Sequence, residues 1–321
     1  MLALLAIALS GFIYEKAPFP SAHASTVVEI GRGELMAAWF GGKQEGAPDV
    51  AIWGAHYRDG KWSEPFEIVR EPDIATYNPV LFHTKDGTLW MYYKFGPHPT
   101  RWTGGRRSSR DGGRNWTAIE HLPAGLYGPI KNKPLLLKDG TIVSGTSVES
   151  YRSWASWVER SSDNGMTWTK HGPITVPGEP YGNIQPTVVS LKGGRLRMFV
   201  RTTERIGKIC YSDSSDGGRT WTPARPTSLP NPNSGIDAVA LRDGRIIMVY
   251  NHTAKGRTPL NVAVSKDGEN WNNFLALETE PGEFSYPAVI QAADGTVHIT
   301  YTWNRKRIKH AAVQLAEIPK Q

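Results

Sequence analysis

Residues 109–116 read Ser-Arg-Asp-Gly-Gly-Arg-Asn-Trp, and the spacing Ser-x-Asp-x-Gly-x-x-Trp in this stretch recurs along the chain. It returns at 161–168 and at 214–221, and shortened versions stand at 57–62 and 265–271. The tryptophans that close these motifs follow one another at intervals of about 50 residues: Trp62, Trp116, Trp168, Trp221 and Trp271. A fixed period of this size predicts a solenoid, a propeller or another repeat array.

A second set of turn residues repeats with the same period. Each turn separates two β-branched or aromatic runs, which predicts two-residue hairpin turns of the primed types. The six turns are Gly31-Arg32-Gly33, Asp86-Gly87, Asp139-Gly140, Gly193-Gly194, Asp243-Gly244 and Asp294-Gly295. Six turns predict six units, and we find no sustained 3.6-residue apolar period that would predict a helix.

Each unit reads as four short strands, and residues 27–30, 35–40 and 50–56 are the first three strands of the first unit. Four-stranded units repeated radially form a propeller. We therefore predict an all-β fold, a six-bladed β-propeller of four-stranded antiparallel blades. The last unit shows only three strands, and residues 11–15 are expected to supply its fourth. Residues 11–321 are interpreted as one propeller domain, and residues 1–10 as the remnant of a signal peptide.

The tryptophan motifs themselves have a structural interpretation. An Asp side chain can bond the backbone of its own turn, Gly permits positive φ, and Trp packs between sheets. We therefore do not assign catalysis to Asp111, Asp163 or Asp216.

Composition narrows the class of partner. A formal net charge of +7 favours anionic partners. Because Lys and Arg cluster only at 305–309, we expect an acidic glycan or oligosaccharide and no nucleic acid. One cysteine excludes an internal disulfide framework. The apolar run at 2–9 is too short to span a bilayer, so no stable membrane insertion is expected. We expect a secreted or periplasmic protein, with the cytoplasm as the alternative; the oligomeric state stays open.

The repeat period also locates a candidate site. In a propeller the first strand of each blade lines the central channel, and one end of it opens onto a face. Counting eight residues back from each turn reaches His23, Asn78, Lys131, Gln185, Gly235 and Tyr286, and counting eight forward reaches Lys94, Arg201 and Asn251 among others. Third strands begin near Asp49, Trp102 and Arg257. All these ends are predicted to meet at one face.

These residue types indicate a site for an acidic sugar. Two arginines can grip a carboxylate through paired N–H donors, and a tryptophan face can support a sugar ring. We predict as substrate-binding residues Arg201, Arg257, Gln185, Lys94, Asn78, Lys131, Asn251 and Trp102. No metal or cofactor is required, because the arginines supply the positive charge.

With these residues the chain resembles the sialidase superfamily with Asp-box (bacterial neuraminidase) repeats, over nearly all six units. The resemblance implies a tyrosine nucleophile, which matches Tyr286 in the run 286–290. It implies an acid/base aspartate after a Gly-rich turn, which matches Asp49, with Glu45 and Glu149 as competitors. It also implies that Arg201 and Arg257 are the second and third arginines of a carboxylate clamp.

Two positions depart from the family pattern. His23 stands where the first clamp arginine is expected, and Gln185 stands where a glutamate would activate the tyrosine. An amide cannot take the phenol proton, so Tyr286 needs another base. Since the first and sixth blades are neighbours in a ring, our hypothesis is that His23 acts as the partner of Tyr286.

Three functions remain open at this point. The first is a sialidase-like exo-acting glycoside hydrolase that releases sialic acid or a related 2-keto-3-deoxy sugar acid. The second is a uronate-directed lyase, in which arginine neutralises a carboxylate and a His/Tyr pair removes the adjacent proton. The departures at His23 and Gln185 favour this alternative over an ordinary sialidase. The third is a glycan-binding propeller without activity.

Overall fold

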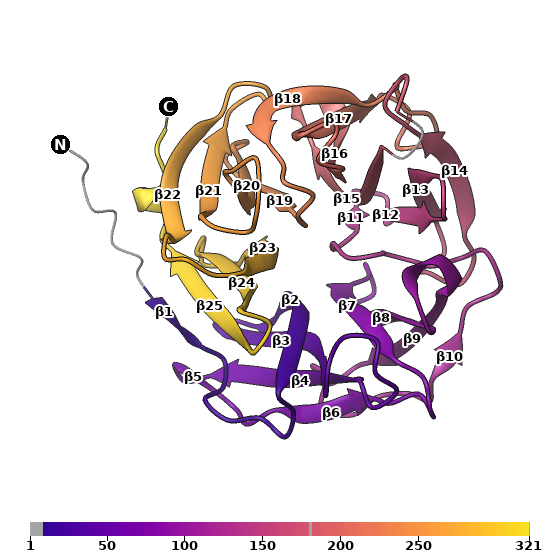
Figure 1. Cartoon of the computed structure of the whole chain (residues 1–321), viewed down its shortest axis with the longest axis vertical. Helices are drawn as coiled ribbons and strands as arrows, with labels where there is room; N and C mark the ends of the chain where they lie inside the picture. Colours follow the sequence, from indigo (N-terminus) through magenta and orange to yellow (C-terminus); the bar gives the residue numbers. More distant parts are fainter. Residues whose placement is uncertain (1–8, 180–181, 321) are drawn as a thin grey trace.

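The computed structural model describes residues 9–179 and 182–320, and six antiparallel sheets are arranged in a ring around a central axis (Figure 1). Blade one contains β2 (Ser21–Gly31), β3 (Glu34–Gly42), β4 (Ala51–Arg58), β5 (Lys61–Trp62) and β6 (Phe66–Val69). Blade two contains β7 (Thr76–His83), β8 (Leu89–Phe95), β9 (Thr103–Ser109) and β10 (Glu120–His121). Blade three contains β11 (Leu135–Leu136), β12 (Ile142–Glu149), β13 (Trp154–Ser161) and β14 (Thr169–Ile174).

The other three blades complete the ring. Blade four contains β15 (Asn183–Ser190), β16 (Leu196–Thr202), β17 (Lys208–Ser214) and β18 (Arg225–Pro230). Blade five contains β19 (Asp237–Ala240), β20 (Ile246–Asn251), β21 (Leu260–Ser265) and β22 (Asn272–Glu278). Blade six contains β23 (Phe284–Gln291), β24 (Val297–Trp303), β25 (Arg307–Val313) and β1 (Leu9–Phe12). The predicted six-bladed, all-β fold is confirmed; blade one differs in that β5 and β6 both pair with β4.

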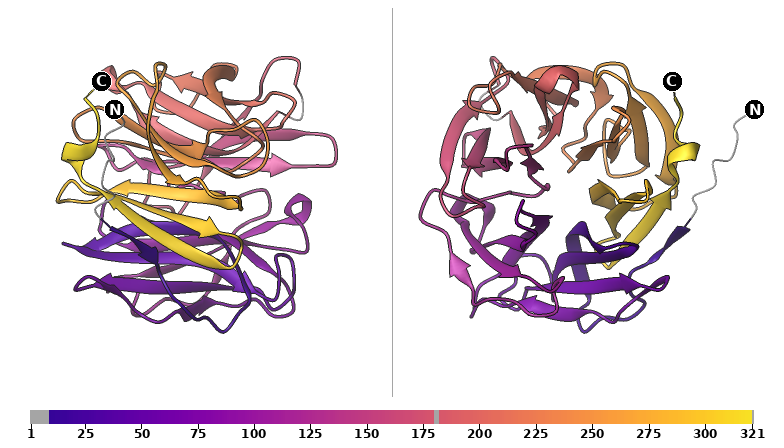
Figure 2. Two further views of the ribbon diagram at one scale, coloured as in Figure 1. Left: turned by 60° about the vertical axis from the view of Figure 1, so that its left-hand side comes forward. Right: turned by 180° about the vertical axis from the view of Figure 1, so that it is seen from behind.

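The N-terminal strand closes the ring, as predicted, at a slightly different place. β1 pairs with β25 from Leu9 opposite Ala312 to Phe12 opposite Lys309 (Figure 2). The prediction put this strand at 11–15, but the paired residues run from Leu9 to Phe12, and Tyr14 beyond them is buried. Its ring is 5% exposed and stacks on Trp39 of blade one, with ring centroids 5.1 Å apart. Most of the predicted signal-peptide remnant lies outside the described residues; Leu9 and Ser10 belong to β1.

The hairpin turns are wider than predicted. At Asp86-Gly87 the Gly87 N–H donates to the Thr84 carbonyl, and Thr84 N–H donates to the Thr88 carbonyl. Gly87 has φ 80°, whereas Asp86 is not among the positive-φ residues, so a primed turn is wrong here. The geometry is a type I turn followed by a left-handed glycine. The aspartate stabilises it by accepting the Thr88 N–H at 3.2 Å.

The tryptophan motifs are structural, as interpreted from the sequence. In the second full motif Ser161 donates to Asp163 at 2.7 Å, Asp163 accepts the Thr167 N–H at 2.9 Å, and the Trp168 indole donates to the Gly165 carbonyl at 3.0 Å. The side chains of Ser161, Asp163 and Trp168 are therefore engaged in closing their own turn.

Asp163→Asn is expected to lower the melting temperature at pH 7 by roughly 2 °C, because weaker hydrogen bonds close the turn. Partial burial alone would raise the pKa of Asp163, but hydrogen bonds from Thr167 and Ser161 outweigh it and lower the pKa to about 2. The carboxylate's contribution is therefore complete above its ordinary pKa near 4 and is lost as the pH falls toward 2. Melting curves between pH 4 and pH 2 should fall less steeply for the variant than for the wild type; parallel curves would contradict this.

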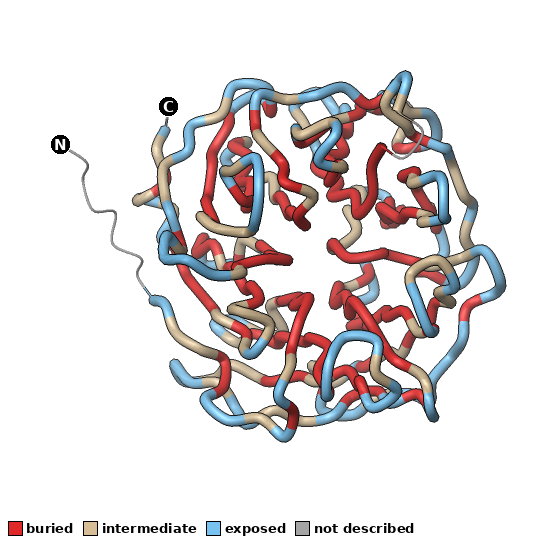
Figure 3. Tube along the Cα trace, viewed as in Figure 1, coloured by how far each residue is buried: buried red, intermediate tan, exposed pale blue. Residues whose placement is uncertain are grey.

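The inner strands of the blades carry most of the buried residues, while the turns and outer strands are exposed (Figure 3). The helical segments of the described residues are three-residue 3-10 turns. Within residues 9–179 and 182–320, no helix has the length and apolar character needed to cross a membrane.

Candidate active site

Four inner strands share one backbone irregularity at the positions that the repeat period picks out. Ala24, Asn78, Gln185 and Tyr286 have φ of 55°, 40°, 54° and 51°. In each strand the register shifts there, so that two residues face one on the neighbouring strand. Three of the four positions precede a proline, a residue that sheets tolerate at bulges because it lacks an N–H. Left-handed backbone at bulky residues is costly and concentrates at functional sites.

Of these four positions, Tyr286 in β23 is the one whose side chain best fits a catalytic role. Its hydroxyl oxygen accepts hydrogen bonds from Arg201 Nη1 at 2.8 Å and from Gln185 Nε2 at 3.1 Å. Gln185 Oε1 in turn accepts Arg201 Nη1 at 3.0 Å, which orients the amide so that its NH₂ points at the tyrosine. The ring lies against Gly235, where a Cβ would come within 3.3 Å of it. Two N–H donors on one phenol oxygen stabilise negative charge on that oxygen.

His23 packs against the ring of Tyr286 rather than bonding its hydroxyl. The ring centroids are 4.2 Å apart, and His23 Nδ1 lies 3.0 Å from Thr302 Oγ1. Its Nε2 is buried, and no described residue bonds it. Burial, together with the positive charges of Arg305, Arg257, Arg201 and Lys131, lowers the pKa of His23 well below its ordinary value. The imidazole is therefore neutral in the free protein.

The two predicted clamp arginines converge on Tyr286 from blades four and five. Their guanidinium carbons lie 5.8 Å (Arg201) and 5.7 Å (Arg257) from the centre of its ring. Arg201 Nε donates to Asn233 Oδ1 at 2.9 Å, and Arg257 Nη1 donates to Glu283 Oε1 at 2.8 Å. Among the described residues neither Nη2 has a hydrogen-bond partner, so each arginine keeps donors for a ligand.

Arg305 and Glu283 belong to this site, and the sequence-based prediction missed them. Glu283 Oε1 accepts Arg257 Nη1 and also Arg305 Nε, both at 2.8 Å. Arg305 continues to Glu45 through an ion pair, so one chain of charges joins blade six to the loop of blade one. Arg305 was missed because it lies in the hairpin 303–307, where Asn304 and Arg305 both have positive φ, and not at a position set by the period.

Three carboxylates compete for the role of proton donor. Asp49 is exposed at the end of loop 43–49, and its Oδ2 accepts the Lys43 N–H at 3.0 Å. Glu45 is ion-paired with Arg305, which disfavours it as a donor. Burial raises the pKa of Glu149, against the effect of Arg201 and with that of Glu45, so Glu149 is electrostatically coupled to the site.

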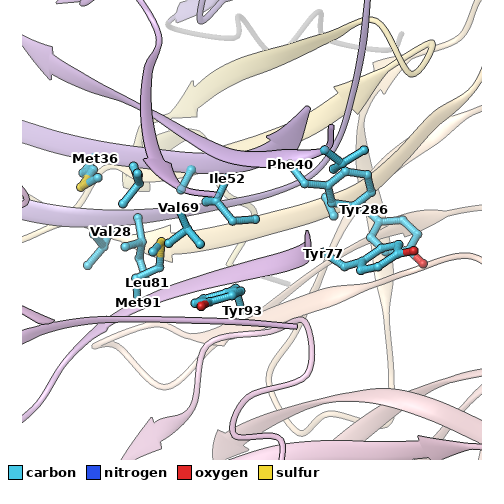
Figure 4. Close-up of a cluster of buried hydrophobic side chains, with 14 of the residues drawn as sticks. Val28, Met36, Phe40, Ile52, Val69, Tyr77, Leu81, Met91, Tyr93 and Tyr286 are labelled. Carbon is cyan, nitrogen blue, oxygen red and sulfur yellow. The ribbon is translucent and has the colours of Figure 1, made fainter. Parts of the chain in front are cut away.

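Loop 43–49 forms part of the rim of the site. Ala47 packs on the cluster that contains Tyr286, and Trp102 rests on the same cluster with its ring centroid 5.0 Å from that of Tyr77. Figure 4 shows Phe40, Tyr77 and Tyr286 together at one end of this cluster, with the aliphatic side chains at the other. The loop also lines a cavity of about 630 Å³. The aromatic end of the core thus lies beside the acidic loop, and residues 43–49 of the loop alone line the cavity.

Four predicted substrate-binding residues lie in the framework around the site instead. Asn78, Lys94, Lys131 and Asn251 are buried, and each donates to a backbone carbonyl: those of Ile130, Pro129, Ile236 and Phe284, respectively. Direct contact with a substrate is therefore not supported for these four. Counting along the repeat found the correct strand ends but could not show which side chains turn inward.

One further groove lies away from the Tyr286 site. A groove of about 580 Å³ runs along the outer edge of the ring, between β1 and the hairpin at 57–64. In the part of the chain that the structure describes, no three His, Cys, Asp or Glu side chains are grouped so that they could hold a metal ion.

Comparison with known proteins supports the fold. The family described as BNR repeat-like domain matches residues 33–299. A protein of unknown function from Dyadobacter fermentans DSM 18053 has a TM-score of 0.81 at 19% identity, covering 96% of this chain and 98% of that one. The Hadza microbial sialidase Hz136 has a TM-score of 0.79 at 20% identity, over 93% of this chain and 66% of that one.

A third structure adds a bound ligand. The intramolecular trans-sialidase from Ruminococcus gnavus, in complex with oseltamivir carboxylate, has a TM-score of 0.77 at 13% identity, covering 99% of this chain and 100% of that one. No curated protein sequence matches the chain. At these identities the likeness establishes the fold and leaves the activity to the site.

Proposed function

Because the chain belongs to the BNR repeat-like domain family, and Arg201 and Arg257 lie beside the ring of Tyr286, we propose that it is a sialidase-like exo-acting glycoside hydrolase. Its substrate would be a glycan ending in sialic acid or a related 2-keto-3-deoxy sugar acid. One observation carries the proposal: the Tyr286 oxygen receives two N–H donors in a strained backbone position, with Arg201 and Arg257 beside its ring.

The arginines would bind the carboxylate of the sugar. Arg201 and Arg257 each keep Nη2 available among the described residues, and they approach from adjacent blades. His23, which stands where the resemblance leads us to expect the first arginine of the clamp, adds a neutral ring nitrogen and no charge. The clamp therefore carries two guanidinium groups and one imidazole, and Arg305 pairs with the same Glu283 oxygen as Arg257.

Two displacements would complete the reaction. In the first, the Tyr286 oxygen attacks the anomeric carbon, the bond to the departing alcohol breaks, and Asp49 protonates the leaving oxygen. The phenol proton passes to His23, which must first turn from the face of the Tyr286 ring toward the hydroxyl, because in the free protein it bonds Thr302 and not Tyr286. The affinity of His23 for a proton rises once the substrate carboxylate offsets the surrounding positive charge. In the second, water attacks the anomeric carbon, Asp49 takes a proton from the water, and the Tyr286 oxygen leaves and regains its proton from His23.

Product analysis by NMR tests the proposal. The protein would be incubated with a panel of sialosides and terminal uronosides, and the released sugars identified. A free saturated acidic sugar is expected. Retained binding without any product would support a glycan-binding propeller and overturn the hydrolase.

Asp49→Asn is expected to reduce turnover of alkyl sialosides by roughly 10²- to 10⁴-fold, because an alcohol leaving group needs a proton. The variant's turnover of aryl sialosides, whose leaving group is an acidic phenol, should fall much less. Glu45→Gln and Glu149→Gln are the matched controls, and both should keep this selectivity unchanged. If Glu149→Gln shows the leaving-group effect and Asp49→Asn does not, Glu149 is the proton donor.

A second candidate is the uronate-directed lyase, and a specific observation favours it. His23 is neutral, its Nε2 is free of bonds to described residues, and its ring contacts that of Tyr286. A neutral imidazole beside a tyrosine can remove the proton next to a carboxylate that arginines neutralise. In the product analysis this reaction would appear as an unsaturated uronate, which a hydrolase cannot form.

A further inference from the structure

We propose that Lys131 is a positioning residue that holds Tyr286 in place from inside the channel. The contact runs through residues 127–133, which we name the crossing segment. The proposal rests on the proposed function only in treating Tyr286 as the reacting residue.

The crossing segment begins on blades two and three. The N–H groups of Tyr127 and Gly128 donate to the buried carboxylate of Glu159 at 3.0 Å and 2.6 Å. Lys94 Nζ donates to the Pro129 carbonyl at 2.5 Å, and Asn78 Nδ2 donates to the Ile130 carbonyl at 3.2 Å. Four hydrogen bonds therefore fix the start of the segment before it leaves the blade.

The segment then projects into the middle of the ring, ahead of β11 (Figure 1), and its side chains reach the neighbouring blades. Asn132 Nδ2 donates to the carbonyls of Gln185 and Pro186 at 3.1 Å and 3.2 Å. Lys133 Nζ donates to Asp237 Oδ2 at 2.8 Å. Lys131 Nζ donates to the carbonyls of Ile236, at 3.1 Å, and Pro287. A segment of blade three thus binds the bulges of blades four and six, which carry Gln185 and Tyr286.

The backbone of Tyr286 needs such support. Its φ of 51° is unfavourable for a residue with a bulky side chain, and conformations of this kind persist only where the surroundings impose them. From the channel side, Lys131 holds the carbonyl of Pro287, and Asp237 Oδ2 accepts the N–H of Val289 at 2.9 Å. Both bonds fall on the unpaired edge of β23 just after the bulge. Releasing Pro287 would let Tyr286 relax toward ordinary strand geometry and move its hydroxyl away from Arg201.

Lysine at this place is otherwise unfavourable, which argues for a specific role. Lys131 is 3% exposed, and its Nζ bonds only backbone carbonyls among the described residues. Burial lowers its pKa to about 7, against the opposing effect of Asp237. The same Nζ lies 5.7 Å from the centre of the Tyr286 ring, so the amine bonds the residue that follows this tyrosine and also lies near its ring.

The test compares Lys131→Met with Lys94→Met. Lys94 is a matched control, because it is equally buried, has a pKa lowered to about 7 and holds the same segment by a carbonyl that is remote from Tyr286. The full chain would be labelled with 3-fluorotyrosine, and among the signals of its 12 tyrosines the one from Tyr286 is identified by its loss in Tyr286→Phe. We expect this ¹⁹F signal to shift in Lys131→Met and to stay in place in Lys94→Met. An unchanged signal in Lys131→Met, or the same shift in both variants, would overturn the proposal.

A kinetic comparison adds a second readout. With an acidic aryl glycoside, Lys131→Met should lose roughly 100-fold in kcat with KM nearly unchanged, since the clamp stays intact while the tyrosine is displaced. Lys94→Met should keep its kcat at temperatures below its own unfolding. If the wild type hydrolyses no acidic glycoside, the proposed function fails, but the ¹⁹F comparison still decides the positioning role. If Lys131→Met does not fold, Lys131→Gln, which is shorter and uncharged but keeps an NH₂ group, takes its place in both measurements.

Discussion

Tyr286→Phe should abolish turnover of acidic glycosides, with kcat lowered by roughly 1,000-fold or more, because the attacking oxygen is gone. Arg201 and Arg257 remain, so the affinity for an acidic sugar should change little. Phenylalanine also fills the same space, and it keeps the ring contacts with His23 and Gly235. Steady-state kinetics and calorimetric titration with the free sugar acid would measure the two effects separately.

Tyr77→Phe is the control for this substitution. Tyr77 lies in the same aromatic end of the core and is 2% exposed, yet its hydroxyl is not bonded to Arg201 or Gln185. We expect it to keep kcat within a few-fold. Comparable losses in both variants would mean that the cluster needs its hydroxyl groups for packing, and Tyr286 would no longer stand out as the nucleophile.

Arg201→Met should lower kcat/KM by roughly 100-fold, which corresponds to about 2.7 kcal/mol of lost transition-state stabilisation. The substitution removes a donor to the substrate carboxylate and the 2.8 Å hydrogen bond to the Tyr286 oxygen. Both KM and kcat should therefore worsen, unlike the effect of Tyr286→Phe, which falls on kcat alone. Initial rates over a range of substrate concentrations give both constants.

Arg205→Met is the matched control, because Arg205 is 73% exposed and pairs with Glu179 outside the site. It should leave both constants within the error of the measurement. An equal loss in the two variants, or an Arg201→Met enzyme with unchanged KM, would show that Arg201 does not bind the carboxylate.

Repetition makes the backbone predictable at the residues that matter most. The turns recur at a fixed distance from the bulges, so counting eight residues back along the sequence reaches the irregular stretches of blades one, two, four and six. The forward count reaches the partner strand next to the bulge: Arg201 lies opposite Ile184, and Lys94 lies opposite Tyr77. The predicted turn type was wrong because Asp-Gly serves both primed turns and a type I turn followed by a left-handed glycine.

The remaining features of the site depend on tertiary contacts that no period encodes. Blade three departs from the repeat, since β11 has two residues and the chain ahead of it crosses the channel. Lys131 therefore bonds blades five and six, although it stands eight residues before its hairpin turn, as Gln185 does. The repeat period did not identify Arg305, because this residue lies in a hairpin between two strands and not at a strand end. Its ion pairs with Glu283 and Glu45 place it at the site.

Covalent trapping of Tyr286 tests the central claim most directly. A sugar acid with fluorine at C3 and a fluoride leaving group forms the glycosyl–enzyme readily and releases it slowly, because the electronegative substituent disfavours the oxocarbenium-like transition state. Mass spectrometry of the digested protein is expected to show the sugar mass on the peptide that contains Tyr286. The adduct should be absent in Tyr286→Phe. Turnover of the same probe without any adduct, or an adduct on another residue, would contradict a tyrosine nucleophile and the function proposed from it.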